Sequence, residues 1–129
     1  MSKYVFGKTV SLGFDQAVEA VTQALAKEGF GVLTEIDVAA TLKKKLGIER
    51  APYKILGACN PQFAASALEM EPQIGALLPC NVVVRQDTGG ETVVEFMDPN
   101  AVLDLAQLPE IGEIAAQVRT RLERVMAAL

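Results

Sequence analysis

The sequence predicts a single α+β domain, residues 1–129, in which a mixed β-sheet carries helices on one face. Short segments with strand composition alternate with segments whose apolar residues recur every three or four positions, as on one face of a helix. Two of the strand segments lie on either side of a turn rich in glycine, which requires one antiparallel pair. The alternation of strands and helices in the first half also permits parallel pairs.

Five ordered elements are expected in the first half of the chain. Apolar spacing predicts helices, and Asp37 is a suitable N-cap for the second helix. Gly29 and Gly47 follow the two helices, as glycine commonly does at helix ends. Proline at position 52 opens the third strand. The expected elements are strand Tyr4–Thr9, helix Phe14–Lys27, strand Phe30–Asp37, helix Val38–Leu46 and strand Tyr53–Cys59.

The second half begins with Asn60 and Pro61, which combine an N-cap with proline at the first helical position. The helix that they start should end near Met70, before Pro72. An irregular segment, a hairpin and a long helix should follow. Their expected bounds are 71–79 for the irregular segment, 81–85 and 92–97 for the hairpin strands, and 109–129 for the last helix.

Composition excludes several kinds of chemistry. The chain has no histidine and only two cysteines, so it cannot form a Ser-His-Asp or Cys-His arrangement. Neither cysteine lies in a CxxC pair, so no structural zinc site and no other metal or cofactor is expected. The net charge of −4 disfavours nucleic acid as a partner. The apolar runs are too short to span a membrane.

The N-terminal stretch, residues 1–10, lacks the charged start and continuous apolar centre of a secretory signal. Two cysteines make at most one disulfide, a poor framework for a chain in which 50% of residues are hydrophobic. We therefore expect reduced thiols and a cytoplasmic location.

Four motifs between Gly29 and Val84 are specific enough to indicate a family. They read GF-V-EIDV, LKKKLG, PYKILGACNP and EP-IG-LLPCNVVV. In this order and spacing they resemble the bacterial and archaeal domain-of-unknown-function family 302. The resemblance implies an α+β fold with a largely antiparallel sheet that grips helices, commonly as a dimer. It implies no agreed activity.

The leading functional hypothesis is a dimeric binding module for a small anionic ligand, and the absence of catalytic constellations favours a non-enzymatic role over an enzymatic one. Basic residues gather in the middle of the chain, and polar residues stand at the ends of the strands around them. A solvated helix face is the ordinary alternative for such a charge run. The candidate ligand-binding residues are Lys43, Lys44, Lys45, Arg50, Lys54, Tyr53, Asn60, Asn81 and Glu35.

The competing hypothesis is thiol chemistry, either redox or sulfur transfer, at Cys59 or Cys80. Cys59 precedes a predicted helix N-terminus, where free N–H groups and the helix dipole stabilise a thiolate. The alternative is that both cysteines fill space at buried strand ends. Glu35 has ordinary uses as well, because it can pair with Lys54 or Arg85 across the sheet.

A third hypothesis is a structural or accessory dimer. The surplus of apolar residues in so small a chain predicts a shared face with a second copy. The last helix is the expected contact, because Ala115, Ala116, Met126 and Ala127 widen its apolar stripe. Arginines of this helix would then meet glutamates of the partner at the rim.

Overall fold

The computed structural model describes residues 3–129; Met1 and Ser2, part of the stretch without secretory-signal features, lie outside the described residues. The strands are β1 Val5–Val10, β2 Gly31–Asp37, β3 Tyr53–Cys59, β4 Cys80–Gln86 and β5 Thr92–Met97. The α-helices are α1 Phe14–Lys27, α2 Val38–Leu46, α3 Pro61–Met70, α4 Pro99–Leu103 and α5 Pro109–Ala127. Two 3₁₀ helices, η1 Pro72–Leu77 and η2 Asp104–Ala106, complete the described elements.

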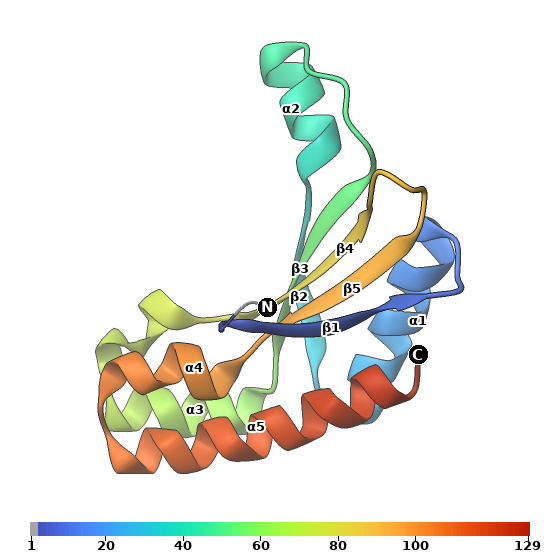
Figure 1. The fold of residues 1–129 in the computed structure, drawn as a ribbon. Coiled ribbons are helices and arrows are strands. Elements are labelled where there is room, and N and C mark those ends of the chain that lie inside the picture. The colour runs from blue at the N-terminus through green and yellow to red at the C-terminus, as the bar shows by residue number, and fades with distance from the viewer. Residues whose placement is uncertain (1–2) are drawn as a thin grey trace.

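The five strands form one sheet in the order β1-β5-β4-β3-β2, and every neighbouring pair is antiparallel. The α+β class is confirmed. The parallel pairs that the alternating front half permitted do not occur among residues 3–129. A parallel pair needs a connection that crosses the sheet from end to end. Instead, the segments that contain α2 and α3 each re-enter the sheet at the end that they left (Figure 1).

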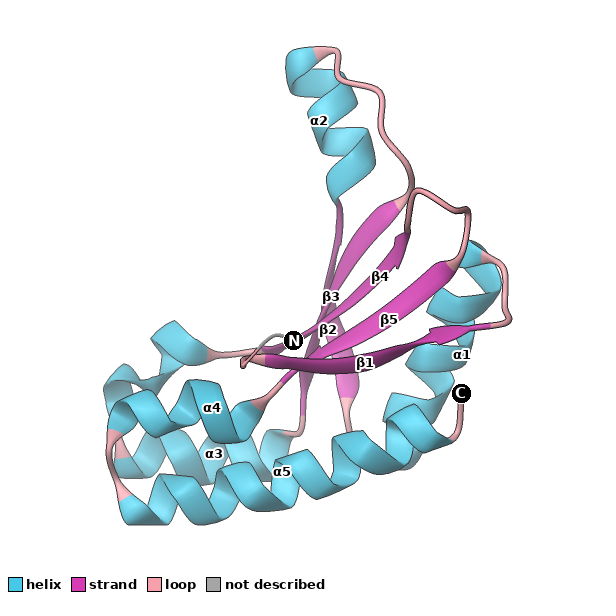
Figure 2. Ribbon diagram, in the orientation of Figure 1, coloured by secondary structure: helices cyan, strands magenta, loops and turns pink. Residues whose placement is uncertain are grey.

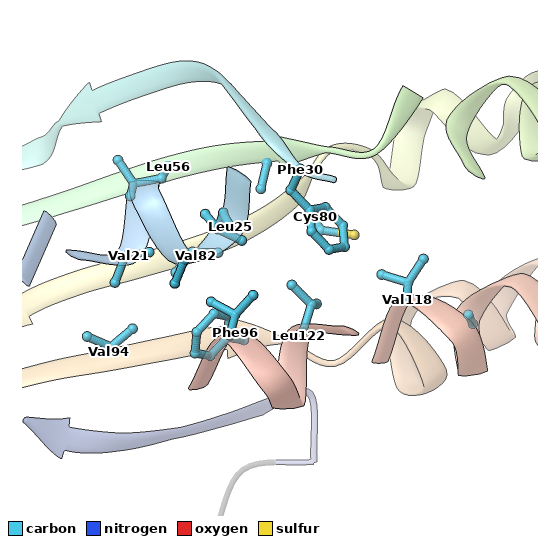
Figure 3. Close-up of a cluster of buried hydrophobic side chains, with 14 of the residues drawn as sticks. Val21, Leu25, Phe30, Leu56, Cys80, Val82, Val94, Phe96, Val118 and Leu122 are labelled. Carbon is cyan, nitrogen blue, oxygen red and sulfur yellow. The ribbon is translucent and has the colours of Figure 1, made fainter. Parts of the chain in front are cut away.

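One face of the sheet packs on α1 and α5, and this layer holds the core (Figures 1 and 2). Val21 and Leu25 of α1 meet strand residues such as Val82, and Leu122 of α5 lies near Phe96 (Figure 3). These five side chains are completely buried. Burying a side chain of this size contributes roughly 1.5–3 kcal/mol. The prediction of helices on one face is confirmed for α1 and α5.

The other helices lie outside that layer. Helix α2 continues outward from the end of β2, away from the rest of the molecule (Figure 1). Helices α3 and α4 and the first half of α5 extend beyond the opposite end of the sheet and pack on one another (Figure 2). The second face of the sheet is covered by neither α1 nor α5.

The expected caps are present. The Asp37 carboxylate accepts a hydrogen bond of 2.8 Å from the Ala40 N–H, and Gly47 ends α2 with φ of 68°. Asn60 Oδ1 accepts bonds from the N–H groups of Gln62 and Phe63 at 3.1 and 3.3 Å. The segment from 71 to 79, expected to be irregular, contains η1, and its Glu71 carboxylate caps that turn.

In the part of the chain that the structure describes, no helix is both long enough and apolar enough to cross a bilayer.

Candidate functional site

An apolar cavity of about 330 Å³, which we call the main cavity for its lining rather than its size, lies where the ends of β3 and β4 meet α3 and α5. This is within the usual range for small-molecule sites, roughly 300–1,000 Å³. The lining is almost entirely apolar. Its wall includes Phe30, Leu33, Ala58, Phe63, Ala64, Ala67, Leu68, Gly75, Leu78, Pro79, Leu103, Ile114 and Val118, together with Thr34, Cys59, Asn60 and Cys80.

Local sequence explains how this wall forms. Phe30 follows the left-handed Gly29, whose φ is 85°, and is 3% exposed. Figure 3 shows Phe30 beside Cys80, with Val118 of α5 facing them from across the cluster. Asn60 ends β3 and caps α3, which directs Phe63 and Ala67 of that helix toward the cavity. Gly75 of η1 lines the same wall.

Asn60 is the only amide that lines the cavity, and it is 7% exposed. Its Oδ1 caps α3, whereas its Nδ2 has no acceptor among residues 3–129. A Cβ built on Gly29 would lie 3.0 Å from this Nδ2 and 3.2 Å from Nη1 of Arg121. Two hydrogen-bond donors therefore lie close together beside Gly29, and an acceptor placed there can bond to both.

Arg121 joins this corner from α5. Its Nη1 donates a 3.0 Å hydrogen bond to the carbonyl of Glu28, and its guanidinium lies 5.1 Å from the centre of the Phe63 ring. Phe63 also lines the cavity. A positive charge thus stands beside one wall of an apolar cavity. The contact between Arg121 and Glu28 is not apparent from the sequence, because the two residues are 93 positions apart and Arg121 lies on a helix expected to face a partner.

Both cysteines line the cavity, and both are free thiols. Cys80 is buried and Cys59 is half-buried. Burial raises the pKa of the Cys80 thiol to about 11, and the neighbouring Cys59 adds to this shift. Cys80 is therefore protonated at neutral pH and a poor nucleophile, because the thiolate is the reactive form.

The basic residues expected to bind an anion are separated from Asn60. Lys54 lies on β3 and pairs with Glu35 at 2.8 Å, a hydrogen bond that raises the pKa of Lys54. Lys43 pairs with Glu49 at 3.2 Å. A second depression holds Lys43, Arg50 and Lys54, but Asp15, Asp37 and Glu49 line it too. Lys44 and Lys45 are exposed on α2 and line none of the three described pockets.

Tyr53 and Asn81 lie together in a third place. They line a depression of about 370 Å³ with Tyr4, Glu95 and Met97. The Arg50 guanidinium covers the Tyr53 ring at 4.9 Å, and Glu95 is paired with Arg85 at 2.7 Å. The predicted set of ligand-binding residues is thus distributed over three surfaces. No group of three metal-ligating side chains occurs in residues 3–129.

These features define an α+β domain with an antiparallel sheet, one helical layer and an apolar cavity at the end of the sheet. The chain belongs to the family described as domain of unknown function DUF302, whose model matches residues 6–129. It is similar to the crystal structure of an uncharacterized conserved protein DUF302 from Bacillus stearothermophilus, with 33% identity over 98% of each chain and a TM-score of 0.91. Among curated proteins no match to this chain is found.

Proposed function

We propose that this domain is a binding module for a small amphipathic anion, with an apolar body in the main cavity and an acidic group near Asn60 and Arg121. The apolar cavity with a single amide on its wall, Asn60, carries this proposal. Desolvating an apolar body supplies affinity, and a few placed polar groups fix its orientation. This keeps the anionic ligand predicted from the sequence but moves its site away from the lysine run.

The charge near Asn60 supports an anion in particular. The Asn60 amide nitrogen and the Arg121 guanidinium are both donors, and an anionic oxygen accepts from both. The basic residues of the second depression offer less, because Glu35 and Glu49 already pair with two of them. A carboxylate or sulfonate on an aromatic or aliphatic body has the required chemistry.

Two fluorescent probes that differ by one sulfonate test the proposal. N-phenyl-1-naphthylamine is neutral, and 1-anilinonaphthalene-8-sulfonate carries the negative charge on the same aromatic body. Both should bind, and the sulfonate should bind more tightly. Saturation at 100 times the dissociation constant should stabilise the fold by about 2.7 kcal/mol.

Gly75→Leu places an apolar side chain on the cavity wall, where its Cβ meets only Leu68 Cδ2, at 3.9 Å. It should weaken both probes at least about tenfold, or 1.4 kcal/mol. Gly112→Leu is the matched control, because Gly112 has nothing within 4 Å of its Cβ position and does not line the cavity. Unchanged binding to Gly75→Leu would refute the site.

Arg121→Gln should weaken the sulfonate alone, and Arg121→Lys should keep most of its affinity. Equal losses for the neutral probe would show that Arg121 acts only through the packing of Phe63. Denaturation curves of both variants check that the fold is retained.

Thiol chemistry is the second candidate, and one observation favours it: half-buried Cys59 lines the cavity at the N-terminus of α3. We expect Cys59, rather than Cys80, to be alkylated by iodoacetamide in the folded protein. If neither thiol reacts before the protein unfolds, this candidate is eliminated. Free thiols also support a cytoplasmic location, which cell fractionation checks.

A further inference from the structure

Residues 38–50, which we call the arm, have little contact with the rest of the described chain. None of the nine residues of α2 is buried. Leu46 is 67% exposed and Ile48 46% exposed. An isolated helix of this length is only marginally stable in water. The arm therefore has apolar side chains and a helix that would gain from a second surface.

Charge is separated between the arm and the opposite end of the molecule. The arm carries four basic residues, Lys43, Lys44, Lys45 and Arg50, against one acid, Glu49. We call residues 61–79 and 99–118 the helical tip; they hold five carboxylates and no lysine or arginine. The five are Glu69, Glu71, Asp104, Glu110 and Glu113. Figure 1 shows the arm and the helical tip at opposite ends of the sheet.

The helical tip also exposes apolar side chains. Leu68 is 43% exposed, Met70 47% and Leu105 72%. Leu68 lines the main cavity, as does Leu33 of β2, which is 68% exposed. These two leucines therefore form part of the open rim of the cavity. No large apolar side chain of α5 is comparably exposed.

Strand β2 relates the position of the arm to that of the cavity. It is an edge strand of the sheet, and α2 begins directly at its end. A two-fold axis beside β2 would place the two copies of β2 antiparallel. Each arm would then run past the start of the partner's β2, where Phe30 and Leu33 line the cavity. The same rotation places the basic arm of each copy beside the acidic helical tip of the other.

We propose that the arm of a second copy docks on the rim of the cavity at Leu33 and Leu68, in a reciprocal two-fold dimer. The partner's Leu46 and Ile48 cover the apolar rim, and its Lys44 and Lys45 face the carboxylates of the helical tip. A two-fold interface of this kind is self-complementary and closed. Each ligand site is thus completed by the other chain, a step that rests on the function proposed above.

Light scattering and sedimentation at micromolar concentration test the docking. The unmodified chain should have the mass of two chains. Leu46→Glu with Ile48→Glu should weaken association at least about 100-fold, because apolar anchors carry most of the energy of an interface. These residues are exposed in the single chain, so the variant should still fold, which its unfolding curve verifies.

Charge reversal gives a more specific test. Lys44→Glu with Lys45→Glu should produce single chains, and Glu69→Lys with Glu113→Lys should restore association when combined with it. Lys3→Glu with Lys27→Glu is the control with the same charge change outside the arm, and it should remain dimeric. Salt should weaken the unmodified dimer, since exposed charges are screened.

Three results would overturn the docking. They are a single-chain mass for the unmodified protein at 100 times the working concentration, arm variants that remain dimeric, and a mass that grows without limit as in an open head-to-tail chain. Cross-linking gives the position independently. A Leu46→Cys chain mixed with a Leu68→Cys chain should form a disulfide-linked pair, and its absence in an intact dimer would overturn this register.

Probe binding separates the two proposals. If the unmodified chain is dimeric and binds neither probe, the function proposed above fails and the docking stands. If arm variants bind both probes as tightly as the unmodified chain, the partner does not complete the site. The expected result is an affinity lowered about tenfold in arm variants and retained in the lysine control.

Discussion

Helices α2 and α5 have similar apolar periodicity in the sequence, but they differ in how many of their residues are buried in the structure. Helix α5 buries six residues, in its first half against α3 and α4 and in its second half, with Leu122 and Val125, against α1 and the sheet. Helix α2 buries none. Periodicity therefore identifies a helix and its apolar face, but it does not say whether that face packs on the same chain or remains available.

The largest expected effect is on the free energy of unfolding, which should respond to a substitution in α5 far more than to one in α2. Leu122→Ala should lower the free energy of unfolding by about 2–5 kcal/mol, because it opens a cavity in the core. Leu46→Ala should change it by less than about 0.5 kcal/mol at concentrations where the chain is monomeric. Urea denaturation measures both. Similar losses would show that the arm packs on its own chain.

The next largest effect is a pH dependence of the free energy of unfolding that comes from the buried Cys80. The native pKa of Cys80 is raised from 9.0 to about 11, so the folded chain holds this proton more tightly than the unfolded chain. The resulting stability is fully present below pH 9 and is lost as pH rises through 11. Two pKa units correspond to about 3 kcal/mol.

Cys80→Ala should remove this part of the pH dependence. The unfolding free energies of the unmodified protein and of Cys80→Ala are compared at pH 7 and near pH 10.5. The difference between the two proteins isolates the contribution of Cys80 from the titration of lysine and tyrosine. A difference between the two proteins that does not change with pH would contradict the raised pKa of Cys80. Cys59→Ala is the matched control on the same cavity.

Loss of a cap should have a smaller effect, and a different one in each helix. Asn60→Ala removes the cap of α3 and should cost about 1 kcal/mol of global stability. Asp37→Ala removes the equivalent cap of α2 and should hardly change global unfolding. It should instead accelerate amide exchange within residues 38–46. Equal global losses would mean that α2 unfolds together with the core.

The sequence was most informative where structure depends on neighbouring residues. Asp37, Asn60 and Pro61 set helix starts that the structure confirms, and the hairpin around Gly89 and Gly90 is present. Glycine and capping residues act within a few positions of themselves, so their effect can be read locally. For the same reason the α+β class was predicted correctly.

Long-range packing could not be read in the same way. Nothing near Arg121 in the sequence indicates that it reaches Glu28 and lies over Phe63. The lysine run suggested one basic site, yet Glu35 and Glu49 pair with Lys54 and Lys43. The apolar cavity has no motif of its own, because its walls come from strand ends and from α3, η1, α4 and α5, which are spread over the second half of the chain.

The smallest expected effect tests which helix forms the interface of the proposed dimer. The sequence favoured α5, but Ala115 is 1% exposed and Met126 packs against the core, so part of the surplus stripe is used within the chain. Ala116 is exposed on α5. If the arm forms the interface, Ala116→Arg should leave the two-chain mass unchanged while Leu46→Glu with Ile48→Glu gives single chains. If Ala116→Arg alone separates the chains, the contact lies on α5, and the exposed residues of the arm need another explanation.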